Sequence, residues 1–334
     1  MTKIYLVRHA EAEGNVFRRL QGQYDSFVTP NGRKQIAALA KRFENIEIDA
    51  VYSSDLSRTQ LTAGAIYLPK NLPLTTDRRF RELSVGVWEN LPFGWLDHSD
   101  PERNQAFSHQ PEIWHVEGSE RFEAYTSRFL EAMEELAKKH DEQTIAIVSH
   151  GMVLRGILQR LFYPNDRNAV AHCENTAVTH LTYENGQYSL QFLNDASHIP
   201  HEISTLGRQM WWRGDGKKDF NMWYREMEEG DLSLLQKLGY EMQGDETIRI
   251  SMLVNTPTGA VVCKGDELVF FGLLQEHRGI GLSAQLLGEA ISITRQNGIS
   301  QLHIKREVSH PAALHLLKNY GFQDGKMNIL PSVL

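Results

Sequence analysis

Three short apolar runs in the first half of the chain lead directly into polar residues. Uninterrupted apolar runs of this length are typical of strands buried on both faces of a parallel sheet. The runs cover residues 4–7, 50–54 and 144–148, and the polar residues that follow them are Arg8, His9, Arg58 and His150. Because ligands bind just beyond the carboxyl ends of such strands, we expect these four side chains to meet at one edge of a sheet.

The four side chains that we expect at this edge of the sheet suit a phosphoryl group as ligand. Guanidinium groups match the oxygens of a phosphoryl group in charge and geometry. Arg58 falls in the first turn of an expected helix, where free backbone N–H groups also favour anions. Histidine adds a nucleophilic ring nitrogen. The pattern therefore predicts a phosphoryl-binding site, although His9 on its own could equally be a buried, hydrogen-bonded structural side chain.

The hydrophobic pattern changes in the second half, and 334 residues are more than one such domain needs. Residues 195–201 lose periodicity and predict a domain boundary, which we place between residues 203 and 204. Beyond it, two strands flank a hairpin turn at 255–258, and a third strand leads through a glycine-bearing loop into a helix. The expected elements are a helix over 220–238, strands over 248–254, 259–263, 267–274 and 300–305, and helices over 283–296 and 310–322.

Composition and charge narrow the classes of function. The chain is 41% hydrophobic and 23% charged, as in ordinary soluble proteins, and its net charge of −7 argues against nucleic acid as a main partner. It has no run of 18 apolar residues and no leader-like start, so we expect no membrane partner and a cytoplasmic location. Cys173 and Cys263 lie far apart, which fits a reducing compartment. No acidic cluster has metal-ligand spacing, so we expect no metal.

Several ordered motifs over residues 2–199 resemble those of the histidine phosphatase superfamily, the group that includes the phosphoglycerate mutases. The motifs are Arg8-His9-Ala10, Asn15, residues 21–25, 29–32, 53–59 and 81–89, and Ser149-His150-Gly151. The family has glycine at Ala10, where alanine carries a cost if the backbone needs a positive φ or lies very close to phosphate. The resemblance implies an α/β fold. Residues 1–203 would form a three-layer αβα phosphoglycerate mutase-like domain with a helical lid inserted at about 90–120.

The resemblance also implies roles for the site residues. His9 is expected to attack phosphorus and form a phosphohistidine, and Glu82 to protonate the leaving oxygen, with a pKa raised by nearby phosphate charge. The other expected site residues are Arg8, Arg58, a protonated His150, Asn15, Gln21, Gly22 and Gly151. The substrate would be a small-molecule phosphate ester, and no cofactor is required. Glu82 could instead form a structural ion pair, and Asn15 could cap a turn.

The segment after Glu82 bears on the choice between hydrolysis and mutase transfer. The mutases of this family carry additional basic residues there, which hold a second phosphate and a carboxylate. This chain has no Arg-Arg pair in the segment, and Arg103 and Arg121 are isolated, so hydrolysis is favoured. The lid also contains four aromatic residues, which are either an apolar pocket surface or the small core of the lid itself. They are Phe93, Trp95, Phe107 and Trp114.

The second half resembles the GNAT acetyltransferase family from about Ile248 to Phe322. The family loop reads Arg/Gln-x-x-Gly-x-Gly/Ala, and here Arg278 and Ser283 stand at its two ends. A glycine-bearing loop between strand and helix offers backbone N–H groups to a pyrophosphate. The resemblance implies a smaller α+β domain over 204–334 that binds acetyl-CoA or another acyl-CoA. The expected contacts are Leu273, Arg278, Gly279, Ile280, Gly281, Leu282 and Ser283.

Departures from the GNAT pattern leave three interpretations of this domain open. Leu317 stands where the family often has a general-acid tyrosine, with Tyr320 one turn away, and His310 replaces the usual asparagine. The domain would be an active acyltransferase, a non-catalytic module that binds acyl-CoA and regulates the phosphatase, or a scaffold for packing or for a homodimer.

Overall fold

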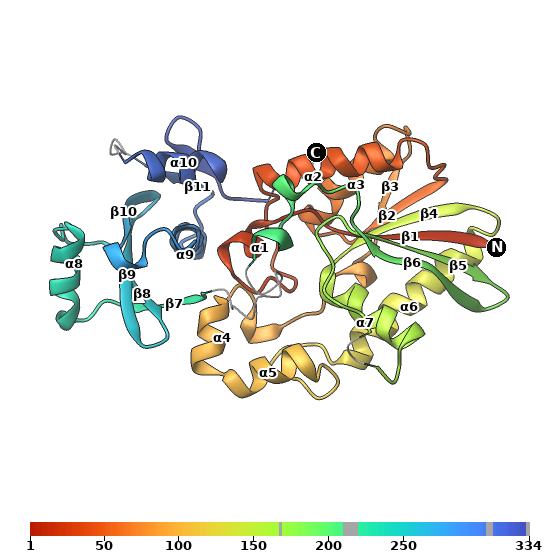
Figure 1. Cartoon of the computed structure of the whole chain (residues 1–334), viewed down its shortest axis with the longest axis horizontal. Coiled ribbons are helices and arrows are strands. Elements are labelled where there is room, and N and C mark those ends of the chain that lie inside the picture. The colour runs from red at the N-terminus through yellow and green to blue at the C-terminus, as the bar shows by residue number, and fades with distance from the viewer. Residues whose placement is uncertain (167–168, 210–219, 305–309, 332–334) are drawn as a thin grey trace.

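Two six-stranded sheets, each accompanied by helices, form the two halves of the chain. The computed structural model describes residues 1–166, 169–209, 220–304 and 310–331. The halves lie side by side along the long axis, with the first sheet on the right of Figure 1 and the second on the left. We call them the first and the second module. The last residue of the strand expected over 300–305 lies outside the described residues.

The first sheet has the order β3-β2-β4-β1-β5-β6, in which the first four strands are parallel, β5 is antiparallel to β1, and β6 is antiparallel to β5. Its strands are β1 (Thr2–Arg8), β2 (Ala50–Ser53), β3 (Leu74–Thr76), β4 (Thr144–Ser149), β5 (Val178–Glu184) and β6 (Gln187–Asp195). The register pairs Arg8 with Ser149 and Ser53 with Val148. The parallel strands therefore end at one level, and the polar residues after them reach the same edge of the sheet, as the sequence pattern predicted.

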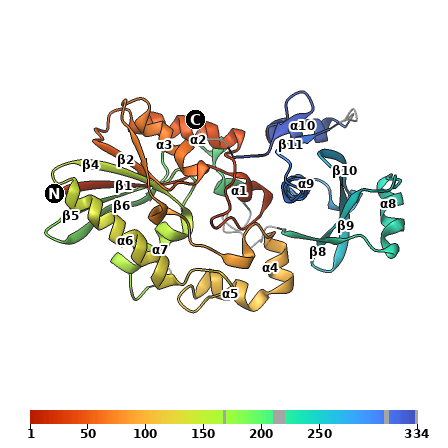
Figure 2. The same ribbon diagram turned by 180° about the vertical axis from the view of Figure 1, so that it is seen from behind.

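Helices cover both faces of the first sheet, which confirms the predicted three layers. Ile4 and Leu6 of β1 belong to a core shared with α6 and α7, whereas Val7 packs with Leu39 of α2 and Ile66 of α3. These helices are α2 (Pro30–Phe43), α3 (Ser57–Tyr67), α6 (Phe122–Lys139) and α7 (Gly151–Phe162). Figures 1 and 2 show the two pairs on opposite sides of the sheet.

A small helical lid follows β3, as expected. It contains α4 (Phe93–Ser99) and α5 (Pro101–His109), while the short helix α1 (Glu13–Phe17) lies between β1 and α2. Trp88, Phe107 and Trp114 are buried, with ring centroids 4.8 to 6.0 Å apart, and Trp95 packs against them. The aromatic residues of the insertion therefore do form a core for the lid.

The second sheet has the order β12-β11-β10-β9-β8-β7, and all neighbours are antiparallel except β10 and β11. Its strands are β7 (Met222–Glu226), β8 (Thr247–Leu253), β9 (Thr256–Lys264), β10 (Glu267–Leu273), β11 (Gln301–His303) and β12 (Lys326–Asn328). The helices of this module are α8 (Leu232–Leu238), α9 (Ser283–Gln296) and α10 (Pro311–Asn319). Ala260 and Val262 of β9 face α8, whereas Val261 and Cys263 face α9, so the sheet lies between these helices.

Two sequence expectations for the second module are corrected. The helix expected over 220–238 is helical only in α8, because β7 pairs with β8 along its whole length. Apolar residues spaced two and four apart occur in both helices and strands. Here the hydrogen-bonded pairing with β8 makes residues 222–226 a strand. The hairpin turn is also shorter than expected. β9 already begins at Thr256, and Pro257 is accommodated at a register shift in the pairing.

The second module contacts the first through α9 and β7. α9 packs on α1, where Phe17 lies against Gly288, and β7 packs on the lid helix α4. Residues 201–209 also pack on the first module: Thr205 Oγ1 donates to Glu11 Oε2 at 2.8 Å. The two modules are thus in direct contact beside the carboxyl edge of the first sheet.

Candidate active site

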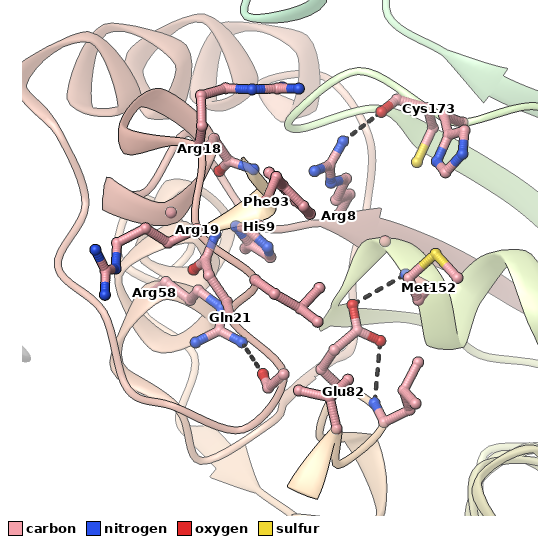
Figure 3. Close-up of a pocket in the computed structure, with 18 of the residues that line it drawn as sticks. Arg8, His9, Arg18, Arg19, Gln21, Arg58, Glu82, Phe93, Met152 and Cys173 are labelled. Atoms are coloured by element: carbon pink, nitrogen blue, oxygen red, sulfur yellow. Dashed lines mark hydrogen bonds between the residues drawn. The ribbon is translucent and has the colours of Figure 1, made fainter. Parts of the chain in front are cut away.

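A cavity of about 260 Å³ opens at the carboxyl edge of the first sheet (Figure 3). Eight of the nine residues predicted for the phosphoryl pocket line it: Arg8, His9, Asn15, Gln21, Gly22, Arg58, Glu82 and Gly151. The ninth, His150, is fully buried, and its ring centroid lies 5.3 Å from that of His9. The fold therefore gathers all nine predicted residues around one point.

His9 follows β1 and is only 4% exposed. Its Nδ1 lies 2.7 Å from the carbonyl oxygen of Ala10. Since a carbonyl only accepts, Nδ1 carries the proton and Nε2 keeps its lone pair. Burial lowers the pKa of His9 well below its ordinary value, and the charges of Arg58 and Arg8 lower it further. The ring is therefore neutral at physiological pH, which is the state that a nucleophile requires.

Two arginines supply positive charge to the cavity. Arg58, in the first turn of α3, is 1% exposed and donates to the carbonyl oxygens of Tyr24 at 2.8 Å and Gly22 at 2.7 Å. Arg8 donates through Nη1 to the carbonyl oxygen of Cys173. In the part of the chain that the structure describes, the buried Nε atoms of both arginines have no hydrogen-bond partner. Each arginine therefore keeps a donor that an anion could use.

His150 is the N-cap residue of α7 and is fully buried. Neither of its ring nitrogens has a hydrogen-bond partner among the described residues, which is unusual for a buried polar group and marks a place for a ligand. Burial lowers the pKa of His150 well below its ordinary value, with further contributions from Arg58 and His9. The ring is thus neutral without an anion beside it, whereas the protonated state was expected of the ring next to a phosphoryl group. The charge of a bound phosphate dianion would raise its pKa.

The carboxylate of Glu82 lies at the N-terminus of α7. It accepts hydrogen bonds from the backbone N–H groups of Met152 at 2.9 Å, Val153 at 2.7 Å and Leu83 at 3.1 Å. Burial raises its pKa, although these donors and the charge of Arg58 act in the opposite direction. The sequence interpretation attributed a raised pKa to phosphate charge, whereas burial is the larger cause here. Among the described residues, Glu82 has no salt bridge within 4 Å.

The two predicted amide side chains line the cavity and also support the backbone around it. Asn15 Oδ1 accepts a hydrogen bond from the backbone N–H of Ala12 at 2.9 Å, so this side chain caps the short helix α1. Gln21 Oε1 accepts from Ser26 Oγ at 2.5 Å. Asn15 therefore acts as a cap, which was the alternative to a phosphate contact. Because Asn15 also lines the cavity, the cap does not exclude the predicted phosphate contact.

The glycines of the pocket are required by space and by backbone conformation. Gly22 has a φ of 50°, and a Cβ atom there would lie 2.3 Å from Glu89 Oε1. A Cβ atom at Gly151 would lie 3.1 Å from Arg8 Nε, which is tight for the guanidinium. Ala10, by contrast, does not have a positive φ, so alanine at this family glycine position causes no backbone strain.

Further residues complete the cavity wall. Its apolar part consists of Leu20, Leu83, Val85, Phe93, Phe107, Met152 and Leu206. Arg18, His172 and Gln209 add polar groups, and the Arg18 guanidinium lies 5.1 Å from the centre of the Phe93 ring. Phe93 and Phe107 confirm that lid aromatics also form a pocket surface. Arg18, His172 and Gln209 carry no sequence signal, because long-range packing brings their segments to the site.

The glycine loop of the second module runs from the end of β10 to the start of α9. Gly279 and Gly281 adopt φ values of 78° and 86°, a conformation that favours glycine. A cavity of about 440 Å³ lies between β10 and α10, and four of the seven predicted acyl-CoA contacts border it: Leu273, Arg278, Gly279 and Ser283.

The other three predicted acyl-CoA contacts are placed differently. Ile280 and Gly281 border a cavity of about 560 Å³ between the two modules. The Leu282 side chain is 1% exposed and belongs to the core of the second module, so only its backbone could meet a ligand. Leu317, at the family's tyrosine position, is likewise buried, whereas Tyr320 borders both cavities of this module.

The part of the chain that the structure describes contains neither a cluster suited to a metal ion nor a helix suited to span a membrane. No group of three or more histidine, cysteine, aspartate or glutamate side chains there is arranged to hold a metal ion. None of the helices within these ranges combines the length and the apolar character needed to cross a bilayer.

Comparison with known proteins places the first module among phosphate-processing enzymes. The profile of the histidine phosphatase superfamily (branch 1) matches residues 4–196. Phosphoserine phosphatase 1 of Hydrogenobacter thermophilus is 34% identical over 157 residues, covering 47% of this chain and 74% of that protein. The metal-independent phosphoserine phosphatase of Arabidopsis thaliana is 32% identical over 205 residues, covering 60% of this chain and 84% of that protein.

A solved structure supports the same assignment of the fold. Bacillus stearothermophilus YhfR is similar with a TM-score of 0.57 and 31% sequence identity. The match covers 60% of this chain and 100% of that protein.

Proposed function

This chain belongs to the histidine phosphatase superfamily, and we propose that its first module hydrolyses phosphomonoesters through a phosphohistidine formed on His9. The observation that carries the proposal is the state of His9: a buried, neutral ring whose Nε2 is unprotonated and which lies beside Arg8 and Arg58. The relatives with phosphoserine phosphatase in their names support phosphatase chemistry.

The reaction would proceed in two displacements. In the first, His9 Nε2 attacks phosphorus and the P–O bond to the leaving group breaks, while protonated Glu82 gives its proton to the leaving oxygen. In the second, a water molecule gives a proton to the Glu82 carboxylate and attacks phosphorus, and the P–N bond breaks. Arg8, Arg58 and His150, once protonated beside the dianion, would stabilise the charge on the phosphoryl oxygens in both steps.

We favour hydrolysis over mutase transfer because of the surface that the lid presents. Phe93 and Phe107 are the lid residues that border the cavity, so among the described residues the lid brings no cation to a second phosphate. Arg103, in α5, is paired with Asp100 at 3.0 Å instead. An apolar wall fits a leaving group with an apolar part.

The proposal is tested by assaying p-nitrophenyl phosphate and phosphoserine with the wild type, His9→Ala, and His109→Ala as a control at an exposed lid histidine. We expect His9→Ala to lose activity on every ester that the wild type hydrolyses, and His109→Ala to retain it. Equal activity of His9→Ala and the wild type would refute the assignment of the nucleophile. Activity that requires a bisphosphate primer would favour the mutase.

For the second module we propose binding of an acyl-CoA in the cavity between β10 and α10. β10 pairs in parallel with β11 at Glu267 and His303, at the start of β10, whereas the cavity lies beside the end of β10, at residues 270–273. The glycine loop follows β10 directly and offers backbone N–H groups at the start of α9 to a pyrophosphate. Acyl transfer is not part of this proposal, because Leu317 replaces the acid that the transfer reaction commonly uses.

Calorimetry with acetyl-CoA tests the second module. We expect saturable binding by the full chain and weaker binding by Arg278→Ala, because Arg278 borders the cavity and donates to the carbonyl oxygen of Leu273 at 2.9 Å, which orders the loop. An absence of binding by the wild type would leave the module as a scaffold. Binding without transfer to any amine would support a regulatory module.

A further inference from the structure

A four-residue junction joins the second module to the wall of the candidate active site. Arg19 Nη1 donates to Glu289 Oε2 at 2.7 Å and Nη2 donates to Ser292 Oγ at 3.1 Å, and both partners lie on α9. Arg19 Nε donates to the backbone and side-chain oxygens of Asn90, at 2.9 and 3.0 Å, where the lid begins. The side chains of Arg19 and Glu289 are 8% and 10% exposed. Three segments far apart in the sequence thus meet at one buried guanidinium.

The junction holds the pocket loop, which we define as residues 18–24, against the lid. Leu20 N donates to Leu91 O at 2.9 Å, and Asn90 N donates to Leu20 O at 2.8 Å. Leu20 lines the cavity, whereas the Arg19 side chain points away from the cavity's centre in Figure 3. Arg19 also belongs to the cavity lining, and its guanidinium is held in place by Glu289, Ser292 and Asn90.

The pocket loop in turn holds a group that binds phosphate in the proposed reaction. The carbonyl oxygens of Gly22 and Tyr24 fix both Nη atoms of Arg58. A second contact from α9 reaches the same loop, because Arg295 donates to the Tyr24 hydroxyl at 2.6 Å and forms a buried ion pair with Glu13. A continuous set of hydrogen bonds therefore links α9 to Arg58 without touching His9.

We propose that Glu289 is a positioning residue for the phosphatase: through Arg19 it keeps the pocket loop, the lid and Arg58 in the arrangement that binds the ester. The proposal rests on the phosphatase function above. Removal of a carboxylate that pairs with a buried arginine is costly, because the guanidinium keeps its hydrogen bonds to Ser292 and Asn90 but loses its counter-charge, which favours its movement toward water together with its segment. Displacement of a binding group by about 1 Å is enough to lower activity by about 100-fold.

The test uses the full chain with Glu289→Ala, Glu289→Gln and Asp231→Ala. Asp231 provides a control carboxylate of similar burial, 7% exposed: it forms an ion pair with the more exposed Arg225 inside the second module, and neither residue lines the cavity. Kinetics on p-nitrophenyl phosphate are combined with hydrogen exchange of peptides that cover residues 18–24 and 90–95. The Gln variant retains an acceptor for Arg19 without the charge.

We expect Glu289→Ala to lower kcat/KM by about 10- to 100-fold, mainly through KM, and to speed exchange in both peptides. KM should change most because α9 supports groups that bind the ester, whereas His9 follows β1 and Glu82 is held by backbone N–H groups in the first turn of α7. Glu289→Gln should recover most of the loss, and Asp231→Ala should match the wild type.

Two results would overturn the positioning role: unchanged kinetics and exchange in folded Glu289→Ala, or an equal loss in Asp231→Ala. A wild type that hydrolyses no ester would instead refute the phosphatase function. The exchange of the two peptides would then decide by itself whether Glu289 fixes the pocket loop.

Discussion

The carboxylate of Glu82 accepts a hydrogen bond of 2.7 Å from the backbone N–H of Val153, in the first turn of the helix that His150 begins. The proposed acid and the buried histidine are therefore fixed to the same helix end. Burial raises the pKa of Glu82, and burial together with nearby charge lowers that of His9. The environment thus favours a protonated acid beside a neutral nucleophile, the pair of states that the first displacement needs.

Glu82→Gln separates the acid role of this residue from its structural role. Glutamine can still accept a hydrogen bond from Val153, but it cannot deliver a proton. We expect turnover of an alkyl phosphate such as phosphoserine, if it is a substrate, to fall by about 10²- to 10⁴-fold. Turnover of p-nitrophenyl phosphate should fall much less, because its leaving group departs without protonation. Steady-state kinetics on both esters measure this difference, and an equal loss on both would contradict the acid role.

The pH dependence of kcat/KM follows from the lowered pKa of His9 and the raised pKa of Glu82. Protonation of His9 removes the nucleophile, and since its pKa is depressed, the acid limb should lie below the ordinary histidine value of 6.5. Deprotonation of Glu82 removes the acid, and since its pKa is raised, the alkaline limb should lie above its ordinary value of 4.5. The wild-type profile on an alkyl phosphate such as phosphoserine, if it is a substrate, should show this alkaline limb, and the profile of Glu82→Gln on the same ester should lack it. Persistence of that limb in the variant would assign it to another group.

Gly94 tests the contact between the lid and the second module. A Cβ atom there would lie 2.4 Å from the backbone carbonyl carbon and oxygen of Met222 in β7. Alanine ordinarily stabilises a helix relative to glycine, but here β7 must move, at a cost of about 1–3 kcal/mol. Gly94→Ala should therefore lower the Tm, whereas Gly230→Ala, with open space around the new methyl group, should leave it nearly unchanged. Equal Tm values in a thermal melt would show that α4 and β7 are not held this closely in solution.

The strand pattern was sufficient to predict the centre of the site. Arg8 ends the buried strand β1, and His9 and His150 directly follow β1 and β4; parallel strands in register must present such residues at one edge. Arg58 was predictable for the same reason, since it falls in the first turn after β2. What the pattern could not give is the lowered pKa of His150, because it depends on complete burial and on the charges of Arg58, Arg128 and Arg8, which only the packed structure brings close.

Other features depended on contacts that no local pattern encodes. Arg19 and Glu289 are 270 residues apart, and each alone resembles an exposed charged residue. The sequence pattern predicts a helix where β7 lies, because five residues fit a helical and a strand periodicity equally well. Pairing with β8 makes this segment a strand. Arg18 and Gln209 reach the cavity from segments whose positions follow from the docking of the second module.

A phosphoryl adduct on His9 tests the central claim most directly. The wild type is mixed with p-nitrophenyl phosphate, quenched within milliseconds under alkaline conditions that preserve phosphohistidine, and digested for mass spectrometry, with His9→Asn treated in parallel. We predict a phosphoryl group on the peptide that contains His9 in the wild type, released during turnover, and none in the variant. Continued hydrolysis by His9→Asn at the wild-type rate, or an adduct on a different residue, would contradict the account.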